Sequence, residues 1–282
     1  MSPSRRTLLS LLIALSLLPL WGARPATGED APLQNMTPAA LQTIAQRLTL
    51  DLSAQGFEVQ SGYIKLYTNE DCEQWSYPIM ESCYFNNPAA PYVLPVVPFW
   101  PEEFVEPAMV HALGGVKEGY GIIRRFDPRE AIVIFGVLPP QADYFGIQTY
   151  LFTREGAWDE NSLAYRTIAE HFPLHLRTFF TRAPGSGKRI QILASLSNAI
   201  NNVVIERQSP SHQAFDQFRV FIITPDQHMD NAIRAVLGKS SIAAGDIFTE
   251  PIPSDMRVGL GEAADDFMTV IRYAMPADET AA

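Results

Sequence analysis

The sequence predicts an α+β protein with a largely antiparallel β-sheet core and flanking helices. Three observations support this fold class. Apolar runs of strand length dominate the middle of the chain, helical repeats of apolar residues lie toward both ends, and strands and helices do not alternate as in a doubly wound parallel sheet. Hydrophobic residues make up 47% of the 282 residues, which excludes a disordered chain.

The first predicted helix begins at Thr37, a favourable cap that is followed by proline at the first helical position. It ends at Gly56, and residues 57–68 then alternate as in a strand. Residues 85–107 contain six prolines, which exclude both a helix and a central strand. The helix is marked by apolar residues at helical spacing: Leu41, Ile44, Leu48 and Leu52.

A continuous apolar run at 131–135 predicts a strand buried on both faces, and the turn at 139–143 leads into an alternating strand at 144–153. These two strands predict a central β-hairpin. The remaining chain predicts one interrupted helical stretch, three strands, a helix after Thr224 and a last amphipathic helix. Their ranges are 159–182 for the helical stretch, 189–196, 203–207 and 218–224 for the strands, and 262–273 for the last helix.

The first 28 residues have the three parts of a secretory signal. Arg5 and Arg6 supply the positive start, 8–20 form an apolar core, and small residues precede a predicted cleavage near Gly28. The core of about 13 residues is too short to span a bilayer, which needs about 20. We therefore expect a periplasmic or secreted protein. Both the ordinary export route and the twin-arginine route fit these residues.

Removing this leader takes away three arginines and no acid, which shifts the net charge from −10 to −13. Such a surface repels phosphate backbones and anionic lipids. The sequence therefore predicts no nucleic-acid partner and no stable membrane insertion after cleavage. We expect one α+β domain over 29–275 and a disordered tail over 276–282.

Cys72 and Cys83 are the only cysteines. In an oxidising compartment such a pair predicts a local disulfide, and the chain-entropy model assigns a loop of this size about 3 kcal/mol. Two buried free thiols are the alternative. A redox role would favour two residues between the cysteines, but here ten lie between them.

No complete catalytic or metal motif occurs. The glycine-rich stretch 183–189 lacks the first glycine and the final Ser or Thr of a phosphate loop. His171 and His175 are separated by a proline, and no third ligand follows at a recognised spacing. The polar stretch 209–216 contains serine, histidine and aspartate but predicts an ordinary turn. The sequence therefore predicts no cofactor and no metal.

Two functional interpretations remain, beside a purely structural or assembly role. The first is an exported binding or accessory protein for an unknown small molecule or protein. Its candidate contacts are aromatic, because tyrosine and tryptophan combine an apolar face with a polar edge. They are Trp100, Tyr144 and Tyr150, with Tyr84 and Tyr92 in the same set.

The second interpretation is an exported hydrolase whose site is assembled from separated residues. His111 or His212 would act as the general base, and Arg124 and Arg125 would stabilise negative charge. Convergence of these side chains in one pocket would favour the enzyme, and scattered positions would favour a binding role.

Overall fold

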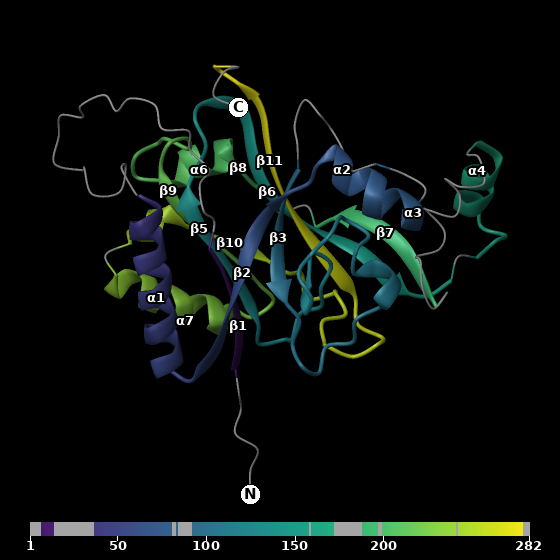
Figure 1. Ribbon diagram of the computed structural model, residues 1–282, viewed down its shortest axis with the longest axis horizontal. Coiled ribbons are helices and arrows are strands. Elements are labelled where there is room, and N and C mark those ends of the chain that lie inside the picture. Colours follow the sequence, from purple (N-terminus) through teal and green to yellow (C-terminus); the bar gives the residue numbers. More distant parts are fainter. Residues whose placement is uncertain are drawn as a thin grey trace, which may run out of the picture.

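Eleven strands of the described chain form one sheet, which the computed structural model shows in Figure 1. The structure describes residues 7–13, 37–80, 83, 92–157, 159–171, 188–196, 199–240 and 242–278. The strands are β1 (Thr7–Ile13), β2 (Phe57–Leu66), β3 (Tyr92–Pro98), β4 (Tyr120–Gly121), β5 (Ala131–Val137), β6 (Ala142–Glu155), β7 (Arg189–Ser195), β8 (Ile200–Asn201), β9 (Phe218–Thr224), β10 (Ile247–Pro251) and β11 (Asp266–Pro276). Their order is β10-β9-β5-β1-β2-β3-β11-β6-β7, with β4 beside β3 and β8 beside β6.

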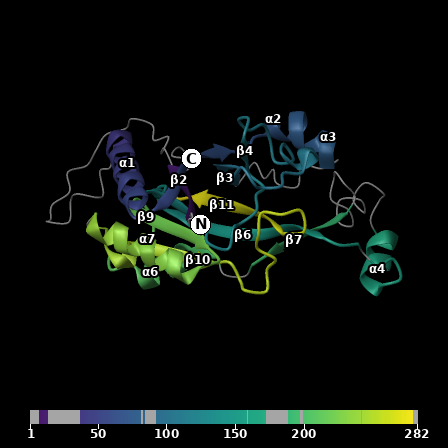
Figure 2. The same cartoon turned by 90° about the horizontal axis from the view of Figure 1, so that it is seen from below.

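Short helices surround this sheet, and most of its strand pairs are antiparallel, so the predicted α+β class is confirmed. Figure 2 shows α1 and α7 together near one end of the sheet and α2, α3 and α4 toward the other. The helices are α1 (Pro38–Ala54), α2 (Asn69–Asp71), η1 (Cys72–Ser76), α3 (Tyr77–Met80), η2 (Pro107–Met109), α4 (Leu163–His171), α6 (Asn202–Gln208), α7 (Gln227–Lys239) and η3 (Ala244–Asp246).

The first helix forms for the reasons that its sequence predicts. The Thr37 side chain accepts a hydrogen bond from the backbone of Ala40, and Pro38 begins α1. The apolar stripe of α1 is buried against β5, β9 and α7 in the core. The predicted helix and the following strand β2 are therefore confirmed.

Both faces of the sheet are covered. Successive side chains of β2 point to opposite faces, so they contact different clusters of the core. Phe57 and Val59 pack on an apolar cluster beneath α1 and α7. Tyr63, on the same face, packs on a second cluster beneath η1 and the 99–123 segment. Ile64 faces a third cluster on the opposite side, which α6 helps to cover.

Two segments have the opposite secondary structure to the prediction. The predicted helix at 262–273 is instead strand β11, which pairs with β6 and β3. A strand covered on both faces is apolar at successive positions, and such a run also contains helical spacings. The predicted strand at 203–207 lies in helix α6, where Asn201 caps the helix and burial of Ile205 outweighs β-branched propensity.

The predicted central hairpin is also wrong. β5 and β6 follow each other along the chain, but β5 pairs with β1 and β9 while β6 pairs with β11, β7 and β8. The turn between them therefore connects two distant parts of the sheet. Sequence proximity favours hairpins, but the pairing partner is decided by the fold.

The proline-rich segment contains a strand that the sequence analysis excluded. β3 passes through Pro95, which lies opposite Ile64 of β2. On its other edge β3 pairs with β11 only at Tyr92 and Val93, and with β4 only from Val97 onward. Pro95 therefore lies where the ladder has a partner on one side, a position that tolerates the missing N–H.

Residues Thr7–Ile13, which the sequence assigns to a leader, form β1 in the uncleaved chain. β1 is parallel to β2 over its whole length and parallel to β5 from Leu9 to Ile13. The apolar residues of an export signal thus also suit a central strand. Cleavage near Gly28 and the boundaries of the 29–275 domain stay predictions.

The C-terminal segment continues beyond the predicted domain boundary. β11 extends to Pro276, and the Ala277 amide donates to the Gln141 carbonyl at 2.9 Å. The last four residues, 279–282, lie outside the described residues. Across the described ranges, no helix is both long and apolar enough to cross a membrane.

Candidate functional site

The predicted disulfide between Cys72 and Cys83 is present. It links η1 to the segment before β3, and Cys72 is buried in the cluster beneath η1. The alternative of two free thiols is therefore wrong. The bridge fixes one end of the cover over this sheet face.

The two candidate arginines lie in the core. Arg124 and Arg125 are 2% and 1% exposed, so neither projects into solvent. The Arg124 guanidinium donates to the Ile122 carbonyl at 3.1 Å and to the Thr269 hydroxyl. Thr269 lies 2.9 Å from the Thr149 hydroxyl, which donates to Glu250 at 2.7 Å. A hydrogen-bonded chain thus leads from Arg124 to a buried carboxyl.

Three carboxyls lie within electrostatic range of the Arg124 cation: those of the buried Glu130 and Glu250 and that of the half-buried Glu103. Burial raises the pKa of Glu103 to about 7, that of Glu130 to about 8 and that of Glu250 to about 7. Burial also lowers the pKa of Arg124 to about 10, which leaves it a cation at neutral pH. We call these four residues the buried charge cluster. A single cation does not balance three carboxylates, so protonation supplies part of the compensation.

Arg125 belongs to a neighbouring set of ion pairs that joins three strands. Its Nε donates to Asp266 of β11 at 2.8 Å, and Arg189 of β7 approaches the same carboxylate at 3.0 Å. Thr153 of β6 also donates to Asp266, and Arg154 holds the adjacent Asp265 at 2.6 Å. Arg125 thus holds the start of β11 in place.

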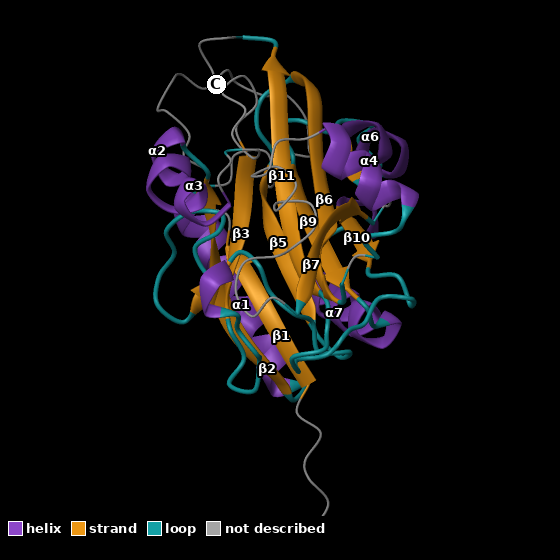
Figure 3. Cartoon of the chain, turned by 90° about the vertical axis from the view of Figure 1, so that its right-hand side faces the viewer, coloured by secondary structure: helices purple, strands orange, loops and turns teal. Residues whose placement is uncertain are grey.

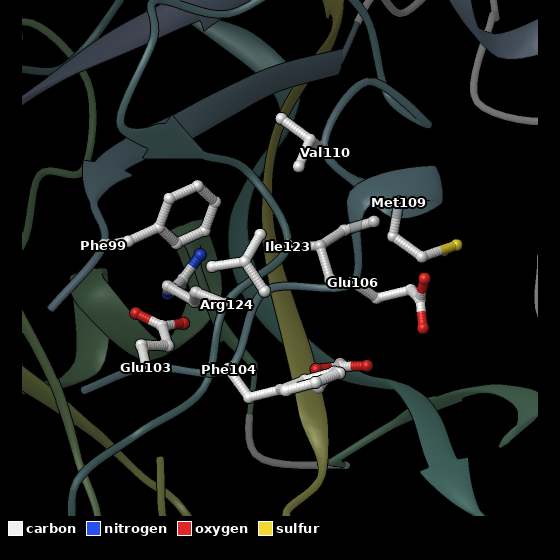
Figure 4. Close-up of a pocket in the computed structure, with 10 residues that line it drawn as sticks. Phe99, Glu103, Phe104, Glu106, Met109, Val110, Ile123 and Arg124 are labelled. Atoms are coloured by element: carbon white, nitrogen blue, oxygen red, sulfur yellow. The ribbon is translucent and has the colours of Figure 1, made fainter. Parts of the chain in front are cut away.

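A small hollow opens above the buried charge cluster. Figure 4 shows Glu103 and Arg124 on one side of it and Glu106 and Met109 on the other. It leaves about 10 Å³ for the centre of a water-sized molecule, which is room for about one water. Both Glu103 oxygens accept backbone N–H bonds, from Arg125 at 2.8 Å and Trp100 at 3.2 Å. The hollow as it stands does not admit an organic substrate.

The two candidate histidines do not approach these arginines. His111 stacks on Trp75 beside η1, with ring centroids 4.6 Å apart. His212 is exposed after α6, and its Nδ1 lies 2.9 Å from the Glu206 carbonyl. The nearby Ser209 and Ser211 hydroxyls are each 3.0 Å from Arg219 Nη2 and serve to hold this buried arginine. The residues proposed for hydrolysis therefore lie in separate places.

The candidate aromatic residues divide into two groups. Trp100 is 2% exposed and belongs to the core, and Tyr84 lies outside the described residues. Tyr144 and Tyr150 lie on one face of β6, because they are six positions apart along the strand and alternate side chains share a face. Both are half-buried.

Two further side chains share that face. Arg272 of β11 lies opposite Gly146 of β6 and opposite Tyr92 of β3. Figure 3 shows these three strands side by side. The Arg272 guanidinium lies 5.1 Å from the centre of the Tyr92 ring, and Tyr150 is within electrostatic range of Arg272, Tyr92 and Tyr144. We call Tyr92, Tyr144, Tyr150 and Arg272 the tyrosine–arginine surface.

Gly146 makes this arrangement possible. A Cβ atom built at Gly146 would come within 2.4 Å of the Tyr144 hydroxyl oxygen. The Tyr144 ring therefore lies across the strand where any larger residue would displace it. Because Gly146 pairs with Arg272, the Tyr144 hydroxyl that fills the place of its missing side chain lies near the arginine.

Arg272 differs from five half-buried or buried arginines that form ion pairs, and it is like Arg124 in having none. Arg125, Arg154, Arg189, Arg219 and Arg234 each form an ion pair with an aspartate. Over the part of the chain that the structure describes, Arg272 has no carboxylate within ion-pair distance, and its buried Nε has no hydrogen-bond partner. The hydroxyl of Tyr144 likewise accepts and donates no protein hydrogen bond among these residues.

Sequence reasoning missed Arg272 because it placed this residue in the predicted helix at 262–273. The available signal was an arginine and a tyrosine inside a run of strand-forming residues, Thr269 to Tyr273. The sequence analysis assigns charge stabilisation to Arg124 and Arg125. In the structure the arginine that lies beside the tyrosines is Arg272.

Within the described ranges, no three histidine, cysteine, aspartate or glutamate side chains lie together as metal ligands. His175 lies outside those ranges. No protein family, curated protein or solved structure matches this chain. Functional inference therefore depends on the geometry described above.

Proposed function

We propose that this chain is an exported binding or accessory protein whose ligand contacts the tyrosine–arginine surface. The observation that carries the proposal is the meeting of Tyr144 and Tyr150 with Tyr92 and Arg272 on one accessible sheet face. The three strands that carry them lie in the interior of the sheet, each with a neighbour on both sides. Half-buried tyrosines on such a support suit binding, because they give contact area with little loss of side-chain entropy.

The export part of the proposal is supported by the leader-like N-terminus and by the Cys72–Cys83 disulfide. Disulfides persist in the periplasm and outside the cell and are rare in a reducing cytoplasm. The strongly acidic composition also favours a protein that stays apart from nucleic acids and anionic membranes.

The hydrolase alternative requires a histidine beside a charge-stabilising arginine. His111, His212 and Arg124 occupy three different environments, and the hollow above Arg124 has room for about one water. No observation on the described residues favours this alternative over binding. It predicts ester, glycoside or peptide hydrolysis that is lost in His111→Ala or His212→Ala.

Native mass spectrometry of the protein recovered from its host, with exported small molecules present, tests the proposal. We expect a retained ligand that is lost in a Tyr144→Ala, Tyr150→Ala variant. The matched control is Tyr77→Ala, a tyrosine that is 56% exposed on α3 and outside the surface. A retained ligand that survives the double substitution, or no retained ligand, would contradict the proposed site.

A further inference from the structure

Resting on the proposed function, we propose that the tyrosine–arginine surface binds a carboxylate attached to a ring with an apolar face. Arg272 pairs with the carboxylate, and the tyrosines contact the ring. The chemistry is shared by aromatic acids and by sugar acids, because both present a carboxylate beside an apolar ring face.

The first argument is the unmet hydrogen-bonding capacity of Arg272. A buried N–H without a partner is unfavourable. Arg124, Arg125 and Arg219 also leave one buried nitrogen without a partner, but their other nitrogens donate to carbonyls, hydroxyls or aspartates, whereas Arg272 makes no hydrogen bond to the described residues. Arginine presents parallel N–H donors that match the two oxygens of a carboxylate. A ligand carboxylate would therefore supply the acid that the protein does not place there.

The second argument is the arrangement of aromatic rings around this cation. The Arg272 guanidinium lies over the Tyr92 ring, a cation–π contact that uses none of its N–H donors. Tyr144 and Tyr150 lie on the other neighbouring strand, β6. Burial raises the pKa of Tyr150, and Arg272 opposes that rise, so the Tyr150 hydroxyl stays protonated at neutral pH and donates to Gln148 at 3.4 Å.

The third argument is the set of groups beside Arg272. Gly146 carries no side chain at the position directly opposite the arginine, and the Tyr144 hydroxyl reaches over it. Farther along the same face, the side chains of Gln148 on β6 and Ser195 on β7 are hydrogen-bonded to each other. A ring seated on the tyrosines would thus have a carboxylate partner at one end and polar contacts at the other.

Ligand-detected NMR titrations with two matched pairs of probes test this inference. The pairs are benzoate against benzamide, and glucuronate against glucose. We expect the acid of at least one pair to bind about tenfold more tightly than its neutral analogue. The pair that shows this preference tells whether the ligand is an aromatic acid or a sugar acid.

Three variants locate the binding. Arg272→Gln should weaken the acid about tenfold and leave the neutral analogue unchanged, whereas Arg272→Lys should weaken it less because the charge remains. Arg47→Gln is the matched control, since it removes an exposed arginine of α1 and alters the net charge equally. Circular dichroism and thermal unfolding confirm that each variant is folded.

The outcomes separate this inference from the proposed function. Equal binding of acid and neutral analogue at the tyrosines would overturn the carboxylate specificity and leave the binding surface intact. Acid binding that is unchanged in Arg272→Gln would place the ligand elsewhere and contradict both. If Arg47→Gln weakened acid binding as much as Arg272→Gln, the loss would come from the change in net charge. The assignment of the carboxylate to Arg272 would then be wrong.

Discussion

At the scale of single residues, the most unusual feature is the buried charge cluster, in which Arg124 lies among three carboxyls. Glu250 is 0% exposed and Glu130 is 1% exposed. Each is tied to the backbone, since Glu250 accepts from the Thr149 amide and Glu130 from the Asp127 amide. These bonds explain how acids can occupy the core, but they do not supply the missing positive charge.

The buried charge cluster predicts stability that decreases as pH rises. The folded pKa values of Glu130 and Glu250, about 8 and about 7, lie above the ordinary value of 4.5. The folded state therefore binds these protons more tightly than the unfolded state, and their contribution is lost as pH rises through 7 to 8. We expect the free energy of unfolding to fall by a few kcal/mol between about pH 6 and 8.5. Urea denaturation at several pH values measures this.

A Glu250→Gln substitution isolates one carboxyl of the cluster. The amide oxygen can still accept from the Thr149 amide, and no proton is lost at high pH. We expect the fall in unfolding free energy between pH 6 and 8.5 to become smaller, with the variant more stable than the parent at pH 8.5. Glu118→Gln, an exposed position, is the control. An unchanged pH profile in Glu250→Gln would contradict the raised pKa.

At the scale of elements, short helical segments are held on the sheet by a side-chain hydrogen bond and by the disulfide. The helical segment α2–η1–α3 covers the sheet face beside β2, and a buried Tyr67 hydroxyl donates to Ser76 there at 2.6 Å. The disulfide closes the same region. The segment between the two cysteines therefore has a structural role, which is to cover this face of the sheet.

Removing the disulfide should destabilise the protein by about 3 kcal/mol. We expect the Cys72→Ser, Cys83→Ser variant to unfold at lower urea, because its unfolded chain gains the freedom that the bridge removes. Reductant should destabilise the parent by a similar amount and leave the variant unchanged. A parent that is insensitive to reductant under unfolding conditions would show that the bridge contributes nothing.

Strand β1 joins two parts of the sheet, β10-β9-β5 and β2-β3-β11-β6-β7. Because β1 is parallel to both neighbours, β2 and β5 are parallel to each other and can pair directly when β1 is absent. For a chain that begins at Glu29, we expect folding with the amides of β5 still protected from hydrogen exchange. Rapid exchange in both β2 and β5 would mean that the vacated position stays open.

At the scale of the whole molecule, the buried charged residues and the tyrosine–arginine surface lie in different parts of the sheet. The charged side chains of the core are gathered where β6, β11 and the 99–125 segment meet, and the tyrosine–arginine surface lies farther along β6 and β11 on an accessible face. The first set stabilises the strands against each other. The second is exposed enough to meet a ligand, which is why we assign the binding role to it.

The proposed export predicts a processed N-terminus. Protein recovered from the periplasm or the medium of its host should begin near Gly28 or Glu29, which intact-mass measurement detects directly. Cytoplasmic material carrying Met1 and reduced cysteines would contradict export. The same measurement on an Arg5→Gln, Arg6→Gln variant should show unprocessed chain if these positive residues start the signal.

The sequence predicted the features that depend on local chemistry. Thr37, Pro38 and the apolar stripe of α1 specify a helix without help from distant residues, and the spacing of Cys72 and Cys83 in an oxidising compartment indicates a bridge. Tyr144 and Tyr150 could be recognised as candidate contacts from residue type alone. Their convergence with Tyr92 and Arg272 could not.

Only the tertiary structure decided the features that depend on partners far along the chain. The segment at 262–273 is a strand because β6 and β3 lie on either side of it, and Pro95 is tolerated because part of β3 lacks a second neighbour. Arg124 and Arg272 have the same side chain, yet one is enclosed by carboxyls and the other faces tyrosines. The physical reason is that burial and charge compensation depend on three-dimensional neighbours, whereas capping, helical spacing and loop closure act within a few residues.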